Sequence, residues 1–408
     1  MSLRVSRAAA PARSRAGMRR YGIAWTAVLI LNGVPGAFAA PYVAPATAPS
    51  VETRPSLVQP VAVFGRDERV PVPPSMRQIA SKIGAVHDRR SHSVCTVFCA
   101  APDVVATAAH CLYRTAEEAP LRLSDLTVRL HGTRASSRIA GADRGAAEAN
   151  VIAGSSALNV HPPIDATRDW ALLRLAQPLC KGGHLPLSRR PVSDVMRLAD
   201  NRHVYNIAYH RDLPKWQPML ARPCSIRRSF EDTSWSTIRN DFTDPDELLL
   251  HTCDTGGASS GSPLLIDGPH GPEVVGVNVG TYVQSKVIML NGEVVHRFKS
   301  DDVANTGVNS LAFAAALDAL KGADTLANRR DIRALQARLA ARGVYDGPRD
   351  GRFGADTRAA IEKLERAAAM PVTGLATRPL LQSLAAESSV VTGKIPPRKE
   401  RTPARRRY

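Results

Sequence analysis

The amino-acid sequence predicts a mostly β protein, an antiparallel barrel or sandwich, with a small helical domain at its C-terminal end. Between Phe64 and about Leu320, short runs of alternating apolar and polar residues are separated by Gly, Pro, Asp and Asn, which is typical of antiparallel strands joined by turns. From residue 330 to 386 the apolar residues recur at intervals of three and four, as on the buried face of a helix. The chain has 408 residues, 44% of them hydrophobic, which is enough for two or three domains with buried cores.

The distribution of charge argues against nucleic-acid binding. The net charge of +17 comes from 54 Lys and Arg against 37 Asp and Glu. Residues 1–40 hold six Arg and no acidic residue, and residues 388–408 hold seven Lys and Arg against one Glu. Most of the excess positive charge therefore belongs to two tails rather than to a folded basic groove.

The first forty residues are typical of an export signal. An Arg-rich stretch precedes the apolar run from Tyr21 to Val34, and Ala37-Phe38-Ala39 then offers the small residues that signal peptidase prefers. A membrane anchor is disfavoured, because the apolar run is shorter than the roughly twenty residues that a spanning helix needs. We predict a signal peptide over residues 1–40, a periplasmic or secreted protein, and no stable membrane insertion after cleavage.

The rest of the chain divides by composition and periodicity. Residues 41–63 are rich in Pro, Ala and Val without periodicity, which predicts a flexible lead or propeptide. The β region is expected over residues 64–320, a linker over 321–329 and the helical domain over 330–386. Residues 387–408 are rich in basic residues and Pro, and we expect a disordered basic tail.

The six cysteines are expected to form disulfides, because an exported chain enters an oxidising compartment. Cys95 and Cys111 bracket sixteen residues with the pattern of a strand and a tight turn, and their spacing gives the best supported pair. The sequence contains no pair of histidines with helical zinc spacing and no Cys-x-x-Cys motif. No metal and no other cofactor is predicted.

Three segments of the β region carry residue types suited to nucleophilic catalysis. His110 ends an apolar run, Asp169 opens an alternating strand, and Ser260 lies among small residues. Small residues packed this densely let backbone N–H groups converge on one point, which an oxyanion hole requires. Each residue alone is more simply interpreted as structural, and only their combination indicates catalysis.

In order and local sequence these segments resemble the trypsin-like, chymotrypsin-fold serine peptidases, especially their bacterial glutamyl-endopeptidase-like branch. The resemblance extends over about residues 64–320 and rests on Gly65–Val70, Thr107–Cys111, Asp169–Leu175, Ser260–Pro263 and Val275–Gly280. It implies a double antiparallel β-barrel with a substrate cleft lined by the last of these segments. It also implies hydrolysis of peptide bonds in a protein or peptide substrate.

The resemblance implies a role for each residue. Ser260 is expected to be the nucleophile, His110 the base that takes and returns its proton, and Asp169 the carboxylate that orients the imidazole. The backbone N–H groups of Ala258 and Ser260 are expected to form the oxyanion hole. Ala258 stands where the family usually has Gly, at a turn where a Cβ restricts the backbone.

Two residues are candidates for the specificity pocket. Asp254, six residues before Ser260, matches the floor of the primary pocket in trypsin-like enzymes, where a carboxylate selects Arg or Lys. The alternative is an Asp that caps a turn beside Cys253. Asn278 stands near the place where the glutamyl branch has a His, which makes acidic specificity less expected.

The resemblance also bears on the remaining disulfides. Cys224 with Cys253 is expected to tie the second barrel beside the nucleophile loop. Cys99 with Cys180 then remains by elimination.

Residues 330–386 resemble the peptidoglycan-binding domain of bacterial cell-wall enzymes, a small three-helix fold. The resemblance rests on Ile332–Leu339, Gly343–Gly347, Asp350–Gly354, Thr357–Ile361 and Thr373-Gly374. It departs at Leu364-Glu365, where relatives often have an aromatic residue followed by Gln. The resemblance implies peptidoglycan as a partner, with a role in protein interaction as the alternative.

The predicted function is that of an exported serine endopeptidase concentrated at the cell wall. A catalytically silent wall-binding or scaffold protein is the alternative that Ala258 keeps open, and cleavage of peptide stems in the wall is a third. The G-x-S-x-G pattern of Gly257–Gly261 also fits an esterase with Ser259 as nucleophile. That interpretation is disfavoured because Pro263 and a strand-like run follow, where an esterase needs a helix.

Overall fold

The computed structural model describes residues 2–7, 62–113, 121–200, 204–230, 234–290 and 293–391, and side chains are described except at 2–7, 283–302 and 386–391. Within the predicted signal peptide and lead, residues 8–61 lie outside the described residues, as do residues 392–408 of the predicted tail. A short strand, β1 (Ser2–Arg7), is described and pairs in parallel with β14.

The first sheet has seven antiparallel strands in the order β7-β6-β3-β4-β5-β9-β8. Their bounds are β3 (Ile83–Asp88), β4 (Val94–Ala101), β5 (Val104–Thr107), β6 (Leu126–Leu130), β7 (Ser136–Arg138), β8 (Val151–Ala153) and β9 (Ala171–Arg174). The alternation of the sequence is realised as an inward apolar face, where Val97, Val105, Val128 and Leu173 are fully buried in one core cluster.

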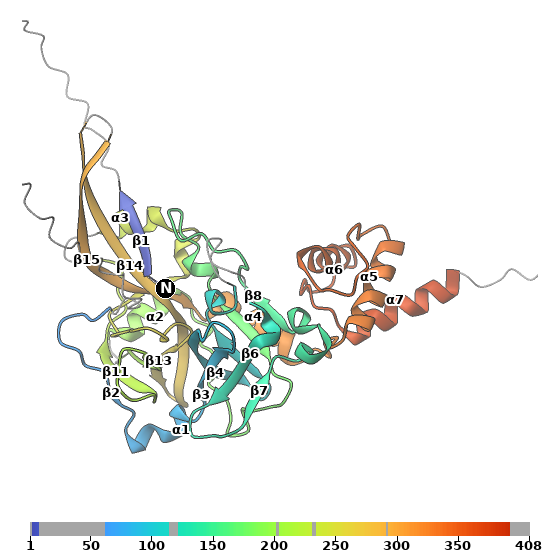
Figure 1. The fold of residues 1–408 in the computed structure, drawn as a ribbon, viewed down its shortest axis with the longest axis horizontal. Coiled ribbons are helices and arrows are strands. Elements are labelled where there is room, and N and C mark those ends of the chain that lie inside the picture. The colour runs from blue at the N-terminus through green and yellow to red at the C-terminus, as the bar shows by residue number, and fades with distance from the viewer. Residues whose placement is uncertain are drawn as a thin grey trace, which may run out of the picture.

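The second sheet has the order β12-β15-β14-β13-β10-β11-β2, with β1 beside β14. Its strands are β2 (Val70–Pro71), β10 (Val204–Ala208), β11 (Met219–Cys224), β12 (Leu248–His251), β13 (Pro263–Gly268), β14 (Gly271–Leu290) and β15 (Glu293–Asn309). β14 and β15 form a long hairpin that projects from the sheet (Figure 1). The predicted mostly β fold with two antiparallel sheets is confirmed.

One continuous core joins the two sheets, and we call the joined unit the two-sheet domain. Phe98 and Leu172 from the first sheet belong to the same buried cluster as Tyr205 and Leu265 from the second. Short helices α1 (Arg77–Ala80), α2 (Val192–Ala199) and α3 (Trp235–Ile238) cover its surface, and α4 (Leu311–Lys321) buries Phe313 in the shared core. The sheets are thus fixed relative to each other, so side chains at their boundary have defined positions.

Three disulfides join segments within the two-sheet domain. Cys95 pairs with Cys111, Cys99 with Cys180, and Cys224 with Cys253. These are the pairs that the sequence analysis expects. The first joins β4 to the turn that carries His110, and the third joins β11 to the segment that precedes the Ser260 turn.

The C-terminal domain contains three helices, α5 (Arg329–Ala341), α6 (Ala355–Ala367) and α7 (Arg378–Val391), as predicted. Leu335 and Ile361 are fully buried between them. The Asn328 side chain caps α5 by accepting a hydrogen bond from the backbone N–H of Asp331. No helix in the described part of the chain is long and apolar enough to cross a membrane.

The unusual Glu365 of the helical domain has a structural role. Its carboxylate accepts hydrogen bonds from the backbone N–H groups of Thr373 and Gly374 at 2.6 and 2.9 Å, and from the Thr373 hydroxyl at 2.6 Å. The carboxylate thereby accepts the hydrogen bonds of the donors in the turn that leads to α7. Glu365 thus provides the hydrogen-bond acceptor that the Gln frequent in relatives would also provide.

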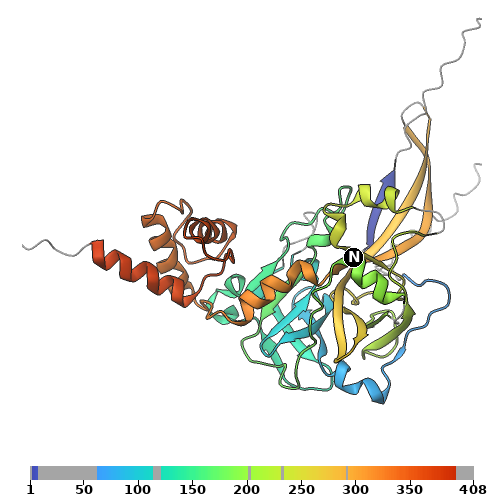
Figure 2. The same ribbon diagram turned by 180° about the vertical axis from the view of Figure 1, so that it is seen from behind.

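The helical domain packs against the two-sheet domain just before β8. Figure 2 shows α4 leading from the sheets toward the helices. Asn150 donates to the carbonyl oxygen of Leu326 at 3.1 Å and accepts from the Thr325 hydroxyl at 2.5 Å. Ala146 and Ala149 are buried in the apolar core of the helical domain. Thr325 and Leu326 of the connecting segment are therefore buried and hydrogen-bonded to the two-sheet domain, while Lys321, Gly322 and Asp324 are exposed.

Candidate active site

His110 and Asp169 form a direct pair. Antiparallel pairing of β5 with β9 sets Thr107 opposite Ala171, which brings the residues after β5 close to those before β9. The His110 Nδ1 lies 2.7 Å from the Asp169 Oδ2, and the His110 backbone N–H donates to the Asp169 Oδ1 at 2.9 Å. An ionised carboxylate only accepts hydrogen bonds, so the proton of the neutral imidazole lies on Nδ1 and Nε2 is a proton acceptor.

The Ser260 turn packs against the segment that leads into His110. A Cβ added at Gly261 would lie 2.1 Å from the Thr107 Oγ1 and 2.3 Å from the Thr96 carbonyl oxygen, so only Gly fits beside Ser260. The Ser260 carbonyl oxygen accepts a hydrogen bond from the Thr96 backbone N–H at 2.9 Å. The structure therefore packs the turn that carries the predicted serine against Thr96 of β4 and Thr107 of β5, three residues before the predicted His110.

Asn278, predicted in the specificity pocket, supports the other side of this turn. Its backbone carbonyl accepts from the Gly261 N–H at 2.8 Å. Its side-chain Nδ2 lies 3.2 Å from the Ser259 carbonyl oxygen and 3.3 Å from the Ser259 hydroxyl. Because Asn278 is only 2% exposed, the structure places its amide inside the protein, against the residue that precedes Ser260.

His251 completes this support and was not anticipated from the sequence. Its Nε2 lies 3.1 Å from the Asn278 Oδ1, and its side chain is fully buried at the end of β12. Burial lowers the pKa of His251 to about 4, so the ring is neutral and donates from Nε2. No local motif indicated the contact, because the strand that carries His251 reaches Asn278 across β15.

The backbone at Ala258 adopts the conformation that the sequence analysis singled out as restricted. Its φ is +77°, in the left-handed region that favours Gly. The Gly257 carbonyl accepts from the Arg211 N–H at 2.6 Å, and the Ala258 carbonyl accepts from the Thr96 hydroxyl at 2.8 Å. Since C=O and N–H point in opposite directions in a trans peptide, the Ala258 N–H is directed away from Arg211.

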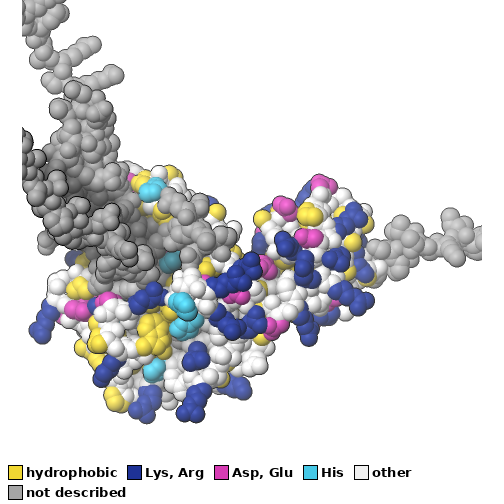
Figure 3. Space-filling view, viewed as in Figure 1, with side chains coloured by type: hydrophobic (Ala, Val, Ile, Leu, Met, Phe, Trp, Pro, Cys, Tyr) yellow, Lys and Arg dark blue, Asp and Glu magenta, His cyan; other side chains and the backbone are white. Residues whose placement is uncertain are grey.

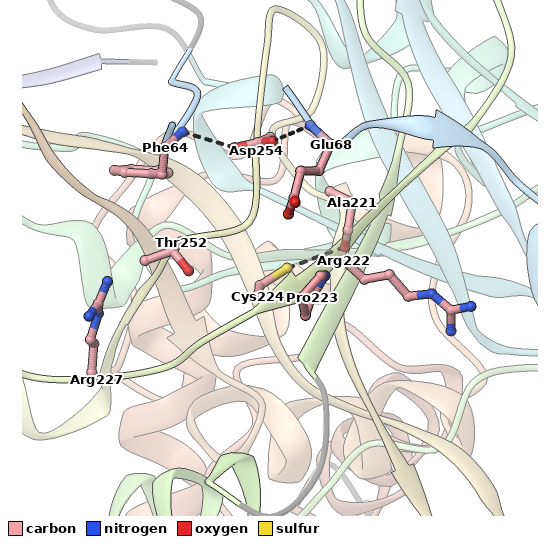
Figure 4. Close-up of a pocket in the computed structure, with 9 residues that line it drawn as sticks. All are labelled: Phe64, Glu68, Ala221, Arg222, Pro223, Cys224, Arg227, Thr252 and Asp254. Carbon is pink, nitrogen blue, oxygen red and sulfur yellow. Dashed lines mark hydrogen bonds between the residues drawn. The ribbon is translucent and has the colours of Figure 1, made fainter. Parts of the chain in front are cut away.

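Asp254, the other predicted specificity residue, binds the chain's own backbone. Its Oδ1 accepts from the Phe64 N–H and its Oδ2 from the Glu68 N–H, both at 2.9 Å (Figure 4). The carboxylate is 5% exposed and borders a cavity of about 140 Å³. The cavity is lined by Phe64, Glu68, Ala221, Arg222, Pro223, Cys224, Arg227, Thr252 and Asp254. Both acceptor oxygens of Asp254 are thus engaged by residues 64–68.

An ionic cluster centred on the buried Arg69 guanidinium packs against the turn at Gly256. The Arg69 guanidinium is 2% exposed and contacts Asp67 at 2.8 Å, Asp212 at 2.7 Å and the His210 Nδ1 at 3.2 Å. Burial, together with the positive charge of Arg69, lowers the pKa of His210 to about 3, which keeps this ring neutral. A Cβ at Gly256 would lie 2.1 Å from the Asp212 Oδ1, so the cluster packs directly on the turn.

One group of potential metal ligands occurs within the described ranges. The ligand atoms of Cys95, His110 and Cys111 lie within 4.8 Å of one another. Cys95 and Cys111 are joined in a disulfide, so they present no thiolate to a metal.

Comparisons with known proteins identify two regions of the chain. Residues 95–277 match the family model of a trypsin-like peptidase domain, and residues 328–384 match that of a peptidoglycan binding domain. The resemblance to trypsin-like peptidases and the resemblance to peptidoglycan-binding domains are thereby confirmed. His110, Asp169 and Ser260 all lie within the first match.

The other comparisons are less specific. A search of the curated proteins gives no match. Among solved structures, one described as a Glu endopeptidase in complex with MPD has a TM-score of 0.41 and 16% sequence identity, and the match covers 64% of this chain and 99% of that chain.

Proposed function

We propose that this chain, which carries a trypsin-like peptidase domain and a peptidoglycan binding domain, is an exported serine endopeptidase that acts near the cell wall. The observation that carries the proposal is the partly buried His110–Asp169 pair at 2.7 Å, whose histidine follows the segment against which the Ser260 turn packs. A histidine held by a carboxylate beside a serine turn suits a hydroxyl nucleophile that must lose its proton at neutral pH.

The reaction follows from the roles of these three side chains. The Ser260 Oγ attacks the carbonyl carbon of the substrate while His110 Nε2 takes its proton, and Asp169 stabilises the resulting imidazolium. The imidazolium then gives its proton to the leaving amine, which departs as the C–N bond breaks and leaves an acyl-enzyme. Water, deprotonated by His110 in the same way, attacks the acyl-enzyme, and the proton returns to Ser260 as the acid product leaves.

The turn geometry supports an oxyanion hole at Ala258 and Ser260. The hydrogen bond from Arg211 to the Gly257 carbonyl directs the next N–H, that of Ala258, to the opposite side. Each such donor typically lowers the barrier by about 3 kcal/mol when the site is preorganised.

The helical domain supplies the proposed attachment to peptidoglycan. Residues 328–384 contain eleven Lys and Arg against six Asp and Glu. Figure 3 shows Lys and Arg side chains over this domain and where it adjoins the two-sheet domain. A positive surface suits the carboxylates of a cell-wall polymer, and attachment raises the local concentration of the peptidase at the wall.

Labelling of the active serine tests the proposal. Mature protein is expected to react with a fluorophosphonate probe and to digest a peptide library, and Ser260→Ala is expected to abolish both. Ser259→Ala is the matched control, and it should retain labelling because its hydroxyl only supports the turn. Loss at Ser259 and retention at Ser260 would contradict the proposed nucleophile.

A second candidate is a catalytically silent wall-binding protein with a peptidase fold. The positive φ of Ala258 favours it, because a non-Gly residue in this conformation is strained at the proposed oxyanion hole. Binding of insoluble peptidoglycan with no fluorophosphonate adduct would support this candidate. Binding together with an adduct at Ser260 would support the peptidase.

A further inference from the structure

Four ring side chains form a partly exposed cluster, which we call the aromatic platform: Trp216, Tyr209, His87 and His131. The Trp216 ring stacks on Tyr209 with centroids 4.8 Å apart and lies 6.1 Å from the His87 ring. The His131 ring lies 6.5 Å from Tyr209, whose hydroxyl is 3.4 Å from the His131 Nδ1. Trp216 remains 47% exposed, although stacking holds its ring in place.

The platform is continuous with the proposed nucleophile turn. The Tyr209 backbone N–H donates to the Thr96 Oγ1 at 3.0 Å, and the same Thr96 hydroxyl donates to the Ala258 carbonyl at 2.8 Å. Arg211, two residues after Tyr209, donates its backbone N–H to the Gly257 carbonyl at 2.6 Å. The segment that carries Tyr209 is therefore bonded directly to the two residues that shape the proposed oxyanion hole.

The platform is also connected to His110. His87 on β3 is paired with Val94 on β4, and Val94 is followed by Cys95. The Cys95–Cys111 disulfide links that strand to the residue after His110. On β14, the other strand that contacts the turn, Asn278 accepts a hydrogen bond from the Gly261 N–H and donates one to the Ser259 carbonyl oxygen.

The chemistry of the proposed reaction decides which half of a substrate meets the platform. His110 must return its proton to the leaving amine, so the residues that follow the scissile bond extend over the side of Ser260 where His110 lies. On that side, β4 pairs through Val94 with His87, and the His87 ring lies 6.1 Å from the Trp216 ring.

We propose that Trp216 is a specificity-determining residue and that the aromatic platform binds an aromatic side chain of the first residue after the scissile bond. The inference rests on the proposed peptidase function. An exposed indole stacked on a second ring offers a rigid face to a third ring at little entropic cost. Burial lowers the pKa of His87, and the positive charges of Arg129 and Arg211 lower it further. The charge of these two Arg also disfavours a Lys or Arg side chain at this subsite.

Substrate pairs that differ only after the scissile bond test the inference. All substrates share one acyl half, the residues before the scissile bond, which is chosen from the library digestion. Substrates with Phe directly after the scissile bond should have a kcat/KM about 2- to 10-fold higher than substrates with Ala there. Trp216→Ala should remove this preference, and Trp216→Phe should restore most of it. Met370→Ala removes a comparably exposed apolar side chain from the helical domain and should leave the preference unchanged.

Acyl transfer separates this inference from the proposed function. An alkyl ester of the same acyl half has no residue after the scissile bond, so Trp216→Ala and wild type should hydrolyse it at equal rates. When phenylalanine amide or alanine amide competes with water for the acyl-enzyme, wild type should favour the phenylalanine amide and Trp216→Ala should favour neither. Ester turnover with equal capture of the two amides by wild type overturns the aromatic platform while the peptidase stands. Absence of both ester turnover and fluorophosphonate labelling overturns the proposed function itself.

Discussion

The Thr96 hydroxyl donates a hydrogen bond to the carbonyl oxygen of Ala258 at 2.8 Å, across 162 residues of sequence. Thr96 is completely buried, and it also accepts from the Tyr209 N–H. One side chain of the first sheet therefore fixes the peptide orientation just before the proposed nucleophile, in the turn that leads into β13 of the second sheet.

Replacing Thr96 tests that relationship. Thr96→Val leaves the buried Ala258 carbonyl without its donor, a loss that costs about 1 to 3 kcal/mol. We expect a fall of about 5- to 100-fold in the fluorophosphonate labelling rate and in kcat, with KM nearly unchanged. Thr96→Ser keeps the hydroxyl and should retain most of the activity. Equal labelling rates for the Val and Ser variants would show that the hydroxyl does not shape the turn.

Ala258 gives a second prediction, in which two substitutions change the stability of the protein in opposite directions. Ala258→Gly removes the steric strain of a Cβ in the left-handed backbone conformation. We expect it to raise the free energy of unfolding by about 1 kcal/mol without loss of activity. Ala258→Val adds a branched Cβ at the same φ and should lower both stability and the labelling rate. Chemical denaturation and labelling kinetics measure the two effects. A Gly variant less stable than the wild type would contradict a strained Ala258.

His251 predicts a dependence of stability on pH. Its pKa of about 4 in the folded protein lies below the ordinary value of 6.5, so the unfolded chain binds the proton more readily. The stabilisation is fully present above about pH 6.5 and is lost progressively as the pH falls toward 4, by about 3 kcal/mol in all. His210 contributes in the same direction, so the measurement must isolate His251.

The matched variant is His251→Gln, whose amide nitrogen can donate to Asn278 but does not titrate between pH 4 and 6.5. Urea denaturation at several pH values should show a smaller loss of stability on acidification in this variant than in the wild type. An identical pH dependence in both proteins would exclude His251 as the titrating group.

Arg358 predicts that the helical domain stabilises the peptidase domain. Its guanidinium stacks on Phe353 at 5.0 Å and donates to the carbonyl oxygen of Val151, the first residue of β8, at 2.8 Å. Arg358→Ala should lower the free energy of unfolding of the whole chain by about 1 to 3 kcal/mol, because this cation and its partner are largely buried.

Arg366 on the same helix provides the control. Its ion pair with Glu362 is exposed, so Arg366→Ala should change the free energy of unfolding by less than about 1 kcal/mol. Comparable losses in the two variants would mean that the contact with Val151 contributes no more than a surface pair.

The sequence was informative where function depends on side chains in local patterns. Alternating strands with turn residues between them predicted the two sheets, because the period of two is a property of each strand alone. His110 and Asp169 were singled out by the combination of their short motifs with the Ser260 motif and by the family resemblance that this combination carries, and antiparallel pairing of β5 with β9 accounts for their contact. The helical period likewise predicted α5 and α6.

The sequence was uninformative where a side chain meets distant backbone or a strand that is not its neighbour. Asp254 binds the N–H groups of Phe64 and Glu68, and a backbone N–H has no signature in the residue type that carries it. His251 reaches Asn278 across an intervening strand, and the ring contacts of Trp216 join segments from both sheets. Such contacts depend on the packing of the two sheets, which no local pattern encodes.

The buried joint at Asn150, Thr325 and Leu326 has a consequence for where the proposed enzyme cuts. A flexible linker would let the peptidase domain take many positions around the point where the helical domain is attached. A rigid connection instead holds the proposed active site at one distance from the peptidoglycan. Proteins embedded in the wall would then be cleaved according to the height of the susceptible bond above the murein surface. On this proposal, the fixed arrangement of the two domains contributes to substrate selection together with the preference for particular residues around the scissile bond.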